Sequence, residues 1–134
     1  LPQSDIVKLS EEEAYLISGQ KDKIAAAECV LSKGASLVAI TLGSKGSELY
    51  TKTQHVKASP MKVQAIDTTG AGDAFLGGLL YEYLRTGKKT DELTFEDLER
   101  IGKTASVVSG ISVTRRGGIP SMPTFSEVKA AIKN

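Results

Sequence analysis

The sequence predicts a layered α/β domain in which helices cover both faces of a sheet. Apolar runs of strand length alternate with helical runs along the chain, which is the pattern of layered α/β domains. Residues 37–42 are continuously apolar, which is typical of a strand buried on both faces of a parallel sheet. With 134 residues, 40% of them hydrophobic and 25% charged, the chain has the size and composition of one globular domain or part of one.

The first part of the chain predicts one strand followed by two helices. Residues 5–9 form a short apolar run of strand length. Ser10 and Glu13 then have the spacing of a capping box, so a helix is expected to begin after Ser10 and to run to about Ser18. A second helix is expected over residues 22–33.

The middle of the chain predicts strands joined by short turns. Residues 43–46, Gly-Ser-Lys-Gly, form a turn directly after the buried strand. Residues 48–51 and 54–57 are expected to be shorter strands that are half exposed, and residues 63–66 to be a further strand.

The last part of the chain predicts three helices. The helix over residues 74–85 carries apolar side chains at the spacing of a core-facing stripe, and Gly77 and Gly78 within it predict close approach to another backbone. Further helices are expected from about residue 95 to 110, which residues 111–115 either extend or leave, and from 124 to 133. The expected inward side chains are Phe75, Leu76, Leu79, Leu80, Tyr83 and Leu84 in the first helix, and Ile101, Ala105, Val108 and Ser109 in the second.

Residues 67–73, Asp-Thr-Thr-Gly-Ala-Gly-Asp, are the most informative segment for function. A loop of small residues before a helix lets backbone N–H groups converge, and the helix start adds free N–H groups and a positive dipole end, so a phosphate site is expected. Asp73 places a carboxylate in this site, as a base for a hydroxyl that receives a phosphoryl group would need. The structural alternative is a tight turn with Asp73 as a helix cap. No Gly-Lys-Ser/Thr follows, so the loop is not a Walker A motif.

Composition excludes several other classes of protein. A net charge of +1 and the lack of a basic stripe with interleaved aromatic residues give no support for binding to nucleic acid or membranes. Cys29 is the only cysteine, so an internal disulfide is excluded, and with His55 as the only histidine a zinc site is not expected. No apolar run reaches the length of a membrane helix and no signal-peptide pattern begins at Leu1, so a cytoplasmic location is the default expectation.

The segment Asp-Thr-Thr-Gly-Ala-Gly-Asp-Ala-Phe over residues 67–75, followed by Gly77-Gly78-Leu79, resembles the C-terminal signature of the ribokinase-like sugar kinases, also called the phosphofructokinase-B family. Residues 117–124 are most similar to those of the fructokinases within that family. The resemblance implies a three-layer α/β/α ribokinase-like fold with a mainly parallel sheet. It also implies that residues 1–134 are the C-terminal, nucleotide-binding and catalytic part of one domain, without the N-terminal sugar-binding half and lid.

The resemblance implies ATP-dependent phosphorylation of a sugar hydroxyl. Asp73 would be the catalytic base, and the backbone N–H groups of Gly70, Ala71, Gly72 and Asp73 would form an anion hole. Without the resemblance, a Gly-x-x-Gly turn between strands is more often a hairpin, and small residues such as Ser106 and Ser109 equally suit helix packing. The positions implied to bind the nucleotide are Thr41, Gly43, Ser44, Gly46, Ser106 and Ser109.

The resemblance also implies cations. Glu13 matches the acid of the family's Asn-x-x-Glu motif, which helps to organise Mg²⁺ and phosphate, but Ser10 replaces the asparagine. A capping box alone would explain both residues. Many family members bind a monovalent cation, here K⁺, largely through backbone carbonyls. The positions that match this second site are Asp67, Thr69, Ser112, Arg115, Gly117 and Ser121.

Several alternatives stay open at this point. The acceptor could be another small alcohol, such as ribose, a nucleoside or a keto-deoxy sugar acid. From a different class, the chain could be an inactive kinase-like binding or scaffold module, which Ser10 slightly favours and the intact loop before Asp73 disfavours. Little or no kinase activity is expected of the isolated chain, and a homodimer is an open alternative for the full-length protein.

Overall fold

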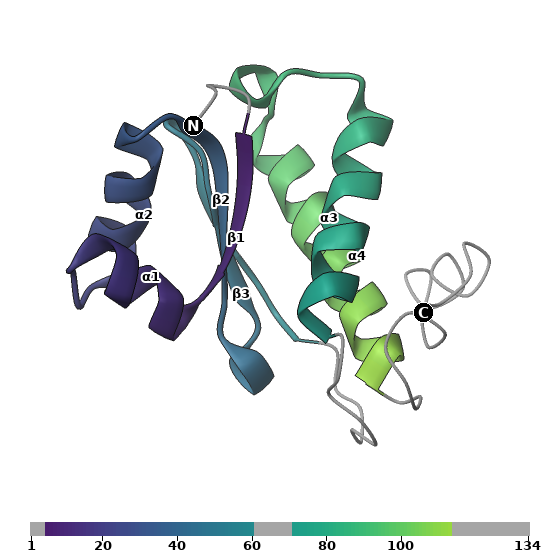
Figure 1. The fold of residues 1–134 in the computed structure, drawn as a ribbon. Coiled ribbons are helices and arrows are strands. Elements are labelled where there is room, and N and C mark those ends of the chain that lie inside the picture. Colours follow the sequence, from purple (N-terminus) through teal and green to yellow (C-terminus); the bar gives the residue numbers. More distant parts are fainter. Residues whose placement is uncertain (1–4, 61–70, 114–134) are drawn as a thin grey trace.

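The computed structural model describes residues 5–60 and 71–113 (Figure 1). The described part contains four strands, four α-helices and two short 3₁₀ turns. In chain order they are β1 (Asp5–Ser10), α1 (Glu11–Ser18), α2 (Lys23–Ser32), β2 (Ala35–Thr41), η1 (Gly43–Lys45), β3 (Ser47–Tyr50), β4 (His55–Ala58), α3 (Ala71–Thr86), η2 (Thr90–Glu92) and α4 (Phe95–Val113).

The described strands form one mixed sheet in the order β1-β2-β3-β4. The β1–β2 pair is parallel and the two following pairs are antiparallel, where a mainly parallel sheet was expected. Connection length explains the difference. Helices α1 and α2 form the crossover between β1 and β2, whereas the short turns after β2 and β3 can only reverse the chain. The strand expected over residues 63–66 lies outside the described residues.

The helices cover the two faces of the sheet as the layered prediction requires. Figure 1 shows α1 and α2 on one face and α3 and α4 on the other. Side chains alternate accordingly along β2: Val38 and Ile40 pack under α1 and α2, and Leu37 and Ala39 pack under α3 and α4. All four are fully buried, so the prediction of a strand buried on both faces is confirmed.

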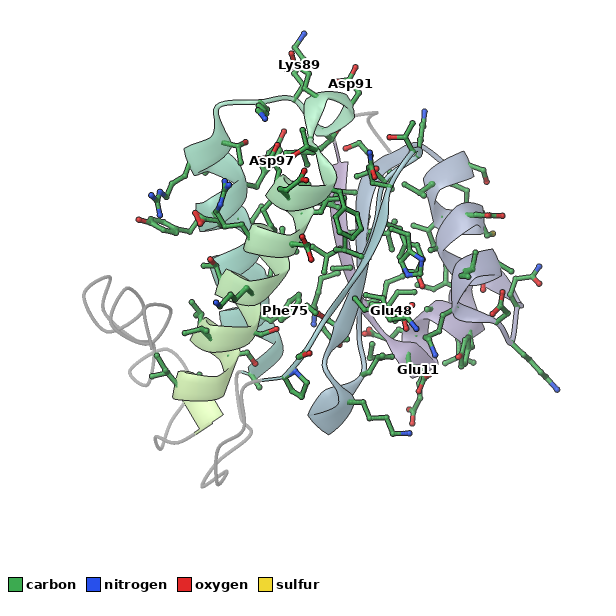
Figure 2. All side chains as sticks on the ribbon, turned by 180° about the vertical axis from the view of Figure 1, so that it is seen from behind. Glu11, Glu48, Phe75, Lys89, Asp91 and Asp97 are labelled. Atoms are coloured by element: carbon green, nitrogen blue, oxygen red, sulfur yellow. The ribbon has the colours of Figure 1, made fainter. Side chains whose placement is uncertain are left out.

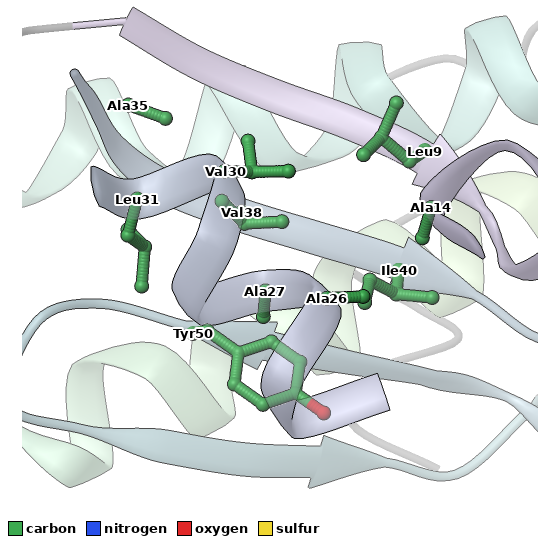
Figure 3. Close-up of a cluster of buried hydrophobic side chains, with 10 residues drawn as sticks. All are labelled: Leu9, Ala14, Ala26, Ala27, Val30, Leu31, Ala35, Val38, Ile40 and Tyr50. Atoms are coloured by element: carbon green, nitrogen blue, oxygen red, sulfur yellow. The ribbon is translucent and has the colours of Figure 1, made fainter. Parts of the chain in front are cut away.

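A cluster of small and branched side chains fills the layer between the sheet and helices α1 and α2 (Figure 3). Ala14, Ala26 and Ala27 are fully buried, and their small side chains let the two helices lie close to the strands. Tyr50 of β3 closes the cluster, with its ring stacked on that of His55 at 4.2 Å between ring centroids.

Strand β3 is buried along its whole length, so the expectation that it is half exposed was wrong. The misleading residue is Glu48, which is only 5% exposed and lies on the α1/α2 side of the sheet (Figure 2). Its carboxylate accepts a hydrogen bond from Tyr50 Oη at 2.5 Å and lies 3.0 Å from His55 Nε2 and 3.7 Å from Lys23 Nζ. Burial raises the pKa of Glu48, but these partners outweigh burial and hold the pKa below its ordinary value. Strand β4 is half exposed, as predicted.

Helices α3 and α4 pack closely against each other on the other face. Gly78 is the reason: a Cβ atom there would lie 2.9 Å from Val108 Cγ2 and 3.1 Å from Ala105 Cα. The predicted close approach is therefore confirmed at Gly78. The buried stripe of α3 is rotated from the predicted one, because Leu80 is 37% and Leu84 is 73% exposed. The buried residues of α3 are Ala74, Phe75, Gly78, Leu79 and Glu82, and Figure 2 shows Phe75 on the sheet side of the helix.

Helix α4 begins at a side-chain cap and continues past residue 110. The N–H of Thr94 donates to the Asp97 carboxylate at 3.0 Å, and the N–H of Asp97 donates to Thr94 Oγ1 at 3.1 Å. The helix runs to Val113, so residues 111–113 extend it, which is one of the two alternatives left open by the sequence. The final helix expected over residues 124–133 lies outside the described residues.

Candidate functional site

One edge of the sheet gathers the described parts of the predicted site. The carboxyl ends of β1 and β2, turn η1, the start of α1, the start of α3 and the end of α4 all lie at this edge (Figure 1). In layered α/β folds, ligands bind outside the carboxyl ends of strands. The structure therefore brings together three segments that the sequence identified separately: residues 10–13, 41–46 and 71–73.

The first turn of α3 holds the described part of the predicted anion hole. Helix α3 begins at Ala71, so Gly72 and Asp73 lie in its first turn and the side chain of Asp73 is exposed. Backbone N–H groups in a first turn have no partner within the helix, and they lie at the positive end of its dipole. Gly70 lies outside the described residues.

Helix α4 fixes the start of α3 through a hydroxyl group. Ser109 Oγ donates a hydrogen bond of 3.2 Å to the carbonyl of Ala71. Ser106, one turn earlier, is 8% exposed, and Ser112 is fully buried. Of the two uses considered for Ser109, the described contacts support helix packing; nucleotide binding by Ser106 and Ser109 stays a prediction.

The turn after β2 closes a hairpin and leaves space at one glycine. The N–H of Leu42 donates to the carbonyl of Gly46 at 2.8 Å, and β2 and β3 pair antiparallel. Gly43 and Gly46 have φ values of 61° and 99°, which favour glycine. A Cβ atom on Gly46 would overlap the carbonyl of Ala58, whereas one on Gly43 would meet no atom within 4 Å. Close approach of β4 therefore explains Gly46, while the backbone at Gly43 is accessible.

Of the two other positions implied to bind the nucleotide near this turn, Thr41 has a structural role. Thr41 Oγ1 donates a hydrogen bond of 3.4 Å to the carbonyl of Leu9 and so links β2 to β1. Ser44 lies within η1, and its side chain is outside the described part. The described contacts thus leave the predicted nucleotide contacts of Thr41 and Ser44 as predictions.

The capping box at the start of α1 is confirmed. The N–H of Ser10 donates to Glu13 Oε1 at 2.9 Å, and the N–H of Glu13 donates to Ser10 Oγ at 3.2 Å. Hydrogen bonding with the backbone and then the side chain of Ser10 lowers the pKa of Glu13, and the charge of Lys8 lowers it further. Glu13 is exposed, so its carboxylate is accessible at the edge where α3 begins.

Lys8 is a residue of this edge that the sequence analysis did not identify. Leu9 packs under α1 and α2 and Ile6 against the opposite cluster, so alternation directs Lys8 toward α3. Its ammonium group lies against the first turn of that helix: a Cβ atom on Gly72 would be 2.7 Å from Lys8 Nζ. The only feature of the sequence that indicates this direction is the spacing of two residues between Ile6 and Lys8, which places both on the same face of the strand. A lysine in a strand, however, usually indicates a solvent-facing position.

The predicted cation sites are only partly described. Over residues 5–60 and 71–113, no group of three or more His, Cys, Asp or Glu side chains is placed to hold a metal ion. Within the same ranges, no helix is long and apolar enough to cross a membrane. Of the positions implied for the monovalent cation only Ser112 is described; Asp67, Thr69, Arg115, Gly117 and Ser121 lie outside the described residues.

Comparison with known proteins gives consistent relatives. Residues 1–125 match the model of the pfkB family of carbohydrate kinases. Fructokinase-1 of Zea mays is 36% identical over 98% of this chain and 40% of its own length. The structure of a fructokinase from Xylella fastidiosa with bound ATP aligns with a TM-score of 0.85 at 31% identity, over 96% of this chain and 42% of the other. That of a fructokinase from Vibrio cholerae with fructose, ADP and calcium aligns with a TM-score of 0.80 at 32% identity, over 94% and 40% of the two chains.

Proposed function

Since this chain belongs to the pfkB family of carbohydrate kinases, we propose that it is the nucleotide-binding and catalytic part of a kinase that transfers phosphate from ATP to a sugar hydroxyl. The observation that carries the proposal is the exposed Asp73 in the first turn of α3, at the carboxyl edge of the sheet. The names of the relatives, and the ATP, ADP and fructose in the solved structures, make fructose the first acceptor to test.

In the proposed reaction, Asp73 is the general base. Its carboxylate takes the proton of the sugar hydroxyl, the hydroxyl oxygen forms a bond to the terminal phosphorus of ATP, and the bond from that phosphorus to the ADP oxygen breaks. The N–H groups of Gly70, Ala71 and Gly72 stabilise the negative charge on the phosphoryl oxygens. An exposed carboxylate beside free N–H groups meets both requirements within one helical turn.

The nucleotide would lie along the turn after β2. Gly43 supports this placement because a side chain there would meet no protein atom, so a ligand can approach the backbone closely. Glu13 offers a carboxylate for Mg²⁺, since its side chain is exposed in the first turn of α1, which begins at the same edge. Mg²⁺ when bound neutralises phosphate charge. A K⁺ ion beside the anion hole, near Ser112, is part of the same proposal.

The chain spans about 40% of the length of most of the curated relatives that it matches. We therefore propose that residues 1–134 are the C-terminal portion of one ribokinase-like domain and that the sugar is selected by residues outside this portion. The isolated chain would then show little or no turnover with any sugar. A coupled assay of ATP consumption across several sugars tests this, and robust turnover by the chain alone would contradict it.

Replacing Asp73 by Asn in the full-length protein tests the proposed base. Turnover should fall by about 10²–10⁴-fold, the usual contribution of a general base, while the affinity for ATP stays nearly constant. Asp91→Asn is the matched control, because Asp91 is also exposed but lies in η2, at the opposite edge of the sheet (Figure 2). Normal turnover in Asp73→Asn would remove Asp73 as the base. ATP binding by the wild type without turnover on any acceptor would instead favour the scaffold alternative.

A further inference from the structure

Lys8 carries a positive charge that interacts favourably with Glu13 but forms no ion pair within the described residues. Its side chain is half-buried at the end of β1, and its ammonium group lies against Gly72. Among residues 5–60 and 71–113, no carboxylate lies within 4.0 Å of Lys8 Nζ. The carboxylate of Glu13 lies beyond ion-pair distance, although the charge of Lys8 lowers its pKa, and its Oε1 caps α1.

On the side of α3, the surroundings of this ammonium group are unfavourable for a cation. Helix α3 begins next to it at Ala71, so the positive end of the α3 dipole and the free N–H groups of the first turn lie close to the positive charge of Lys8. A half-buried lysine also gives up part of its hydration. An anion bound between the ammonium group and the helix start would offset both the repulsion and the lost hydration, because it would accept hydrogen bonds from the ammonium group and from the N–H groups of the helix.

The geometry at Gly72 also indicates an anion site between Lys8 and helix α3. A Cβ atom at this position would meet the lysine ammonium at 2.7 Å and its Cε at 3.9 Å. The ammonium group therefore occupies the space beside Gly72 into which a side chain would extend, and the flexible end of the lysine would have to move aside for one. Such closeness places the ammonium group within reach of an oxyanion held by the N–H groups of the same turn.

We propose that Lys8 is a phosphate ligand, whose ammonium group binds the terminal phosphate of the nucleotide against the first turn of α3. The proposal rests on the proposed function and deepens it, because it adds a side chain to an anion site that the sequence assigned to backbone groups and Asp73 alone. In this position the charge of Lys8 would offset the negative charge of Asp73 and of the phosphate that the base has to approach.

The test is to measure ligand binding to the full-length protein by calorimetry, with inorganic tripolyphosphate, ATP, ADP and adenosine as separate probes. Lys8→Met and Lys8→Gln remove the charge and keep most of the side-chain volume. We expect tripolyphosphate and ATP to bind about 10–100-fold more weakly to both variants, as for a lost charge-assisted hydrogen bond, ADP to lose less, and adenosine to bind as in the wild type. Lys52→Met is the matched control, since Lys52 is exposed in the turn between β3 and β4, at the opposite edge of the sheet.

Two further measurements do not depend on turnover. Thermal unfolding without ligand should give a Tm for Lys8→Met close to that of the wild type, because the loss of the interaction with Glu13 and the relief from the helix dipole oppose each other; a purely structural lysine would give a lower Tm. In the wild type, tripolyphosphate should slow acetylation of Lys8 and leave that of Lys52 unchanged, as read by mass spectrometry. This measurement needs no variant to fold.

Each outcome decides between the two proposals. Unchanged binding of tripolyphosphate and ATP in the folded variants, or acetylation of Lys8 that is indifferent to tripolyphosphate, would overturn the role of Lys8 and leave the kinase proposal standing. Binding of tripolyphosphate that depends on Lys8, in a protein that phosphorylates no sugar, would support Lys8 as a phosphate ligand and count against the kinase. A wild type that binds none of the phosphate probes would overturn both.

Discussion

Replacing Gly78 by alanine tests the packing that positions α3, the helix that carries Asp73. In an exposed helix this substitution would stabilise the protein by about 1 kcal/mol, because alanine has the higher helix propensity. In this structure the new methyl group would lie 2.9 Å from Val108 Cγ2 and 3.1 Å from Ala105 Cα. The sign of the effect therefore depends on whether α4 can move away.

Two features indicate that α4 cannot move without cost. The new methyl group would contact the backbone of Ala105, which has no rotamer to change. It would also contact the branched side chain of Val108, which has one strongly preferred rotamer in a helix. Overpacking of a buried contact costs about 1–3 kcal/mol. The upper part of that range, less the gain of about 1 kcal/mol in propensity, gives a net loss of about 1–2 kcal/mol in the free energy of unfolding.

Urea unfolding followed by circular dichroism measures this loss, with thermal unfolding as a second probe. The double variant Gly78→Ala/Val108→Ala is the internal control, because it removes the methyl group nearest to the new side chain. The two substitutions should be coupled by at least about 0.5 kcal/mol, with the double variant more stable than the sum of the single effects predicts. A Gly78→Ala protein as stable as the wild type, or more stable, would refute the close approach of α3 and α4.

The remaining predictions concern the caps of the other helices. Lys88 Nζ lies 2.7 Å from the Asp97 carboxylate, and this bond, followed by that from the N–H of Thr94, lowers the pKa of Asp97 to about 2. Because the pKa of Asp97 is lower in the folded than in the unfolded state, the ionised carboxylate stabilises the fold above the unfolded pKa, and this stability is lost as the pH falls through the folded pKa. The free energy of unfolding, measured by urea titration, should therefore decline by about 1–2 kcal/mol between about pH 5 and 2, a range that allows for solvent screening of the lysine. The decline should be smaller in Asp97→Asn. Ser10→Ala should cost about 1 kcal/mol in urea unfolding, and Ser10→Asn should cost little, because asparagine caps helices as well as serine does; an equal loss in both would argue against the cap at α1.

Features set by neighbours in sequence could be predicted from the sequence. The cap formed by Ser10 and Glu13 depends on residues three apart, and Gly19 ends α1 with a φ of 71° as an isolated glycine can. The continuous apolar run of β2 likewise indicated burial on both faces. These features follow from local spacing and need no knowledge of the tertiary structure.

Features set by distant partners could not be predicted in this way. Glu48 suggested an exposed strand, because its partners Lys23 and His55 come from another helix and another strand. The buried face of α3 is set by its contact with α4 at Gly78 rather than by the positions of all its apolar residues. The exposed side chain of Leu84 was therefore wrongly expected to point into the core. Lys8 gains its significance only from its distance to Gly72, which is far away in sequence.

The hydrogen bond from Ser109 to Ala71 makes the start of α3 dependent on a second helix. The carbonyl it holds belongs to the same turn whose N–H groups face the proposed phosphate, so a small rotation of α4 would change the direction of those donors. Natural variation in the last two turns of α4, at positions other than Ser106, Ser109 and Ser112, would then alter the catalytic rate through the direction of those donors. Ser109, 38 positions away from Ala71 in the chain, is where such long-range effects on the reaction should first be sought.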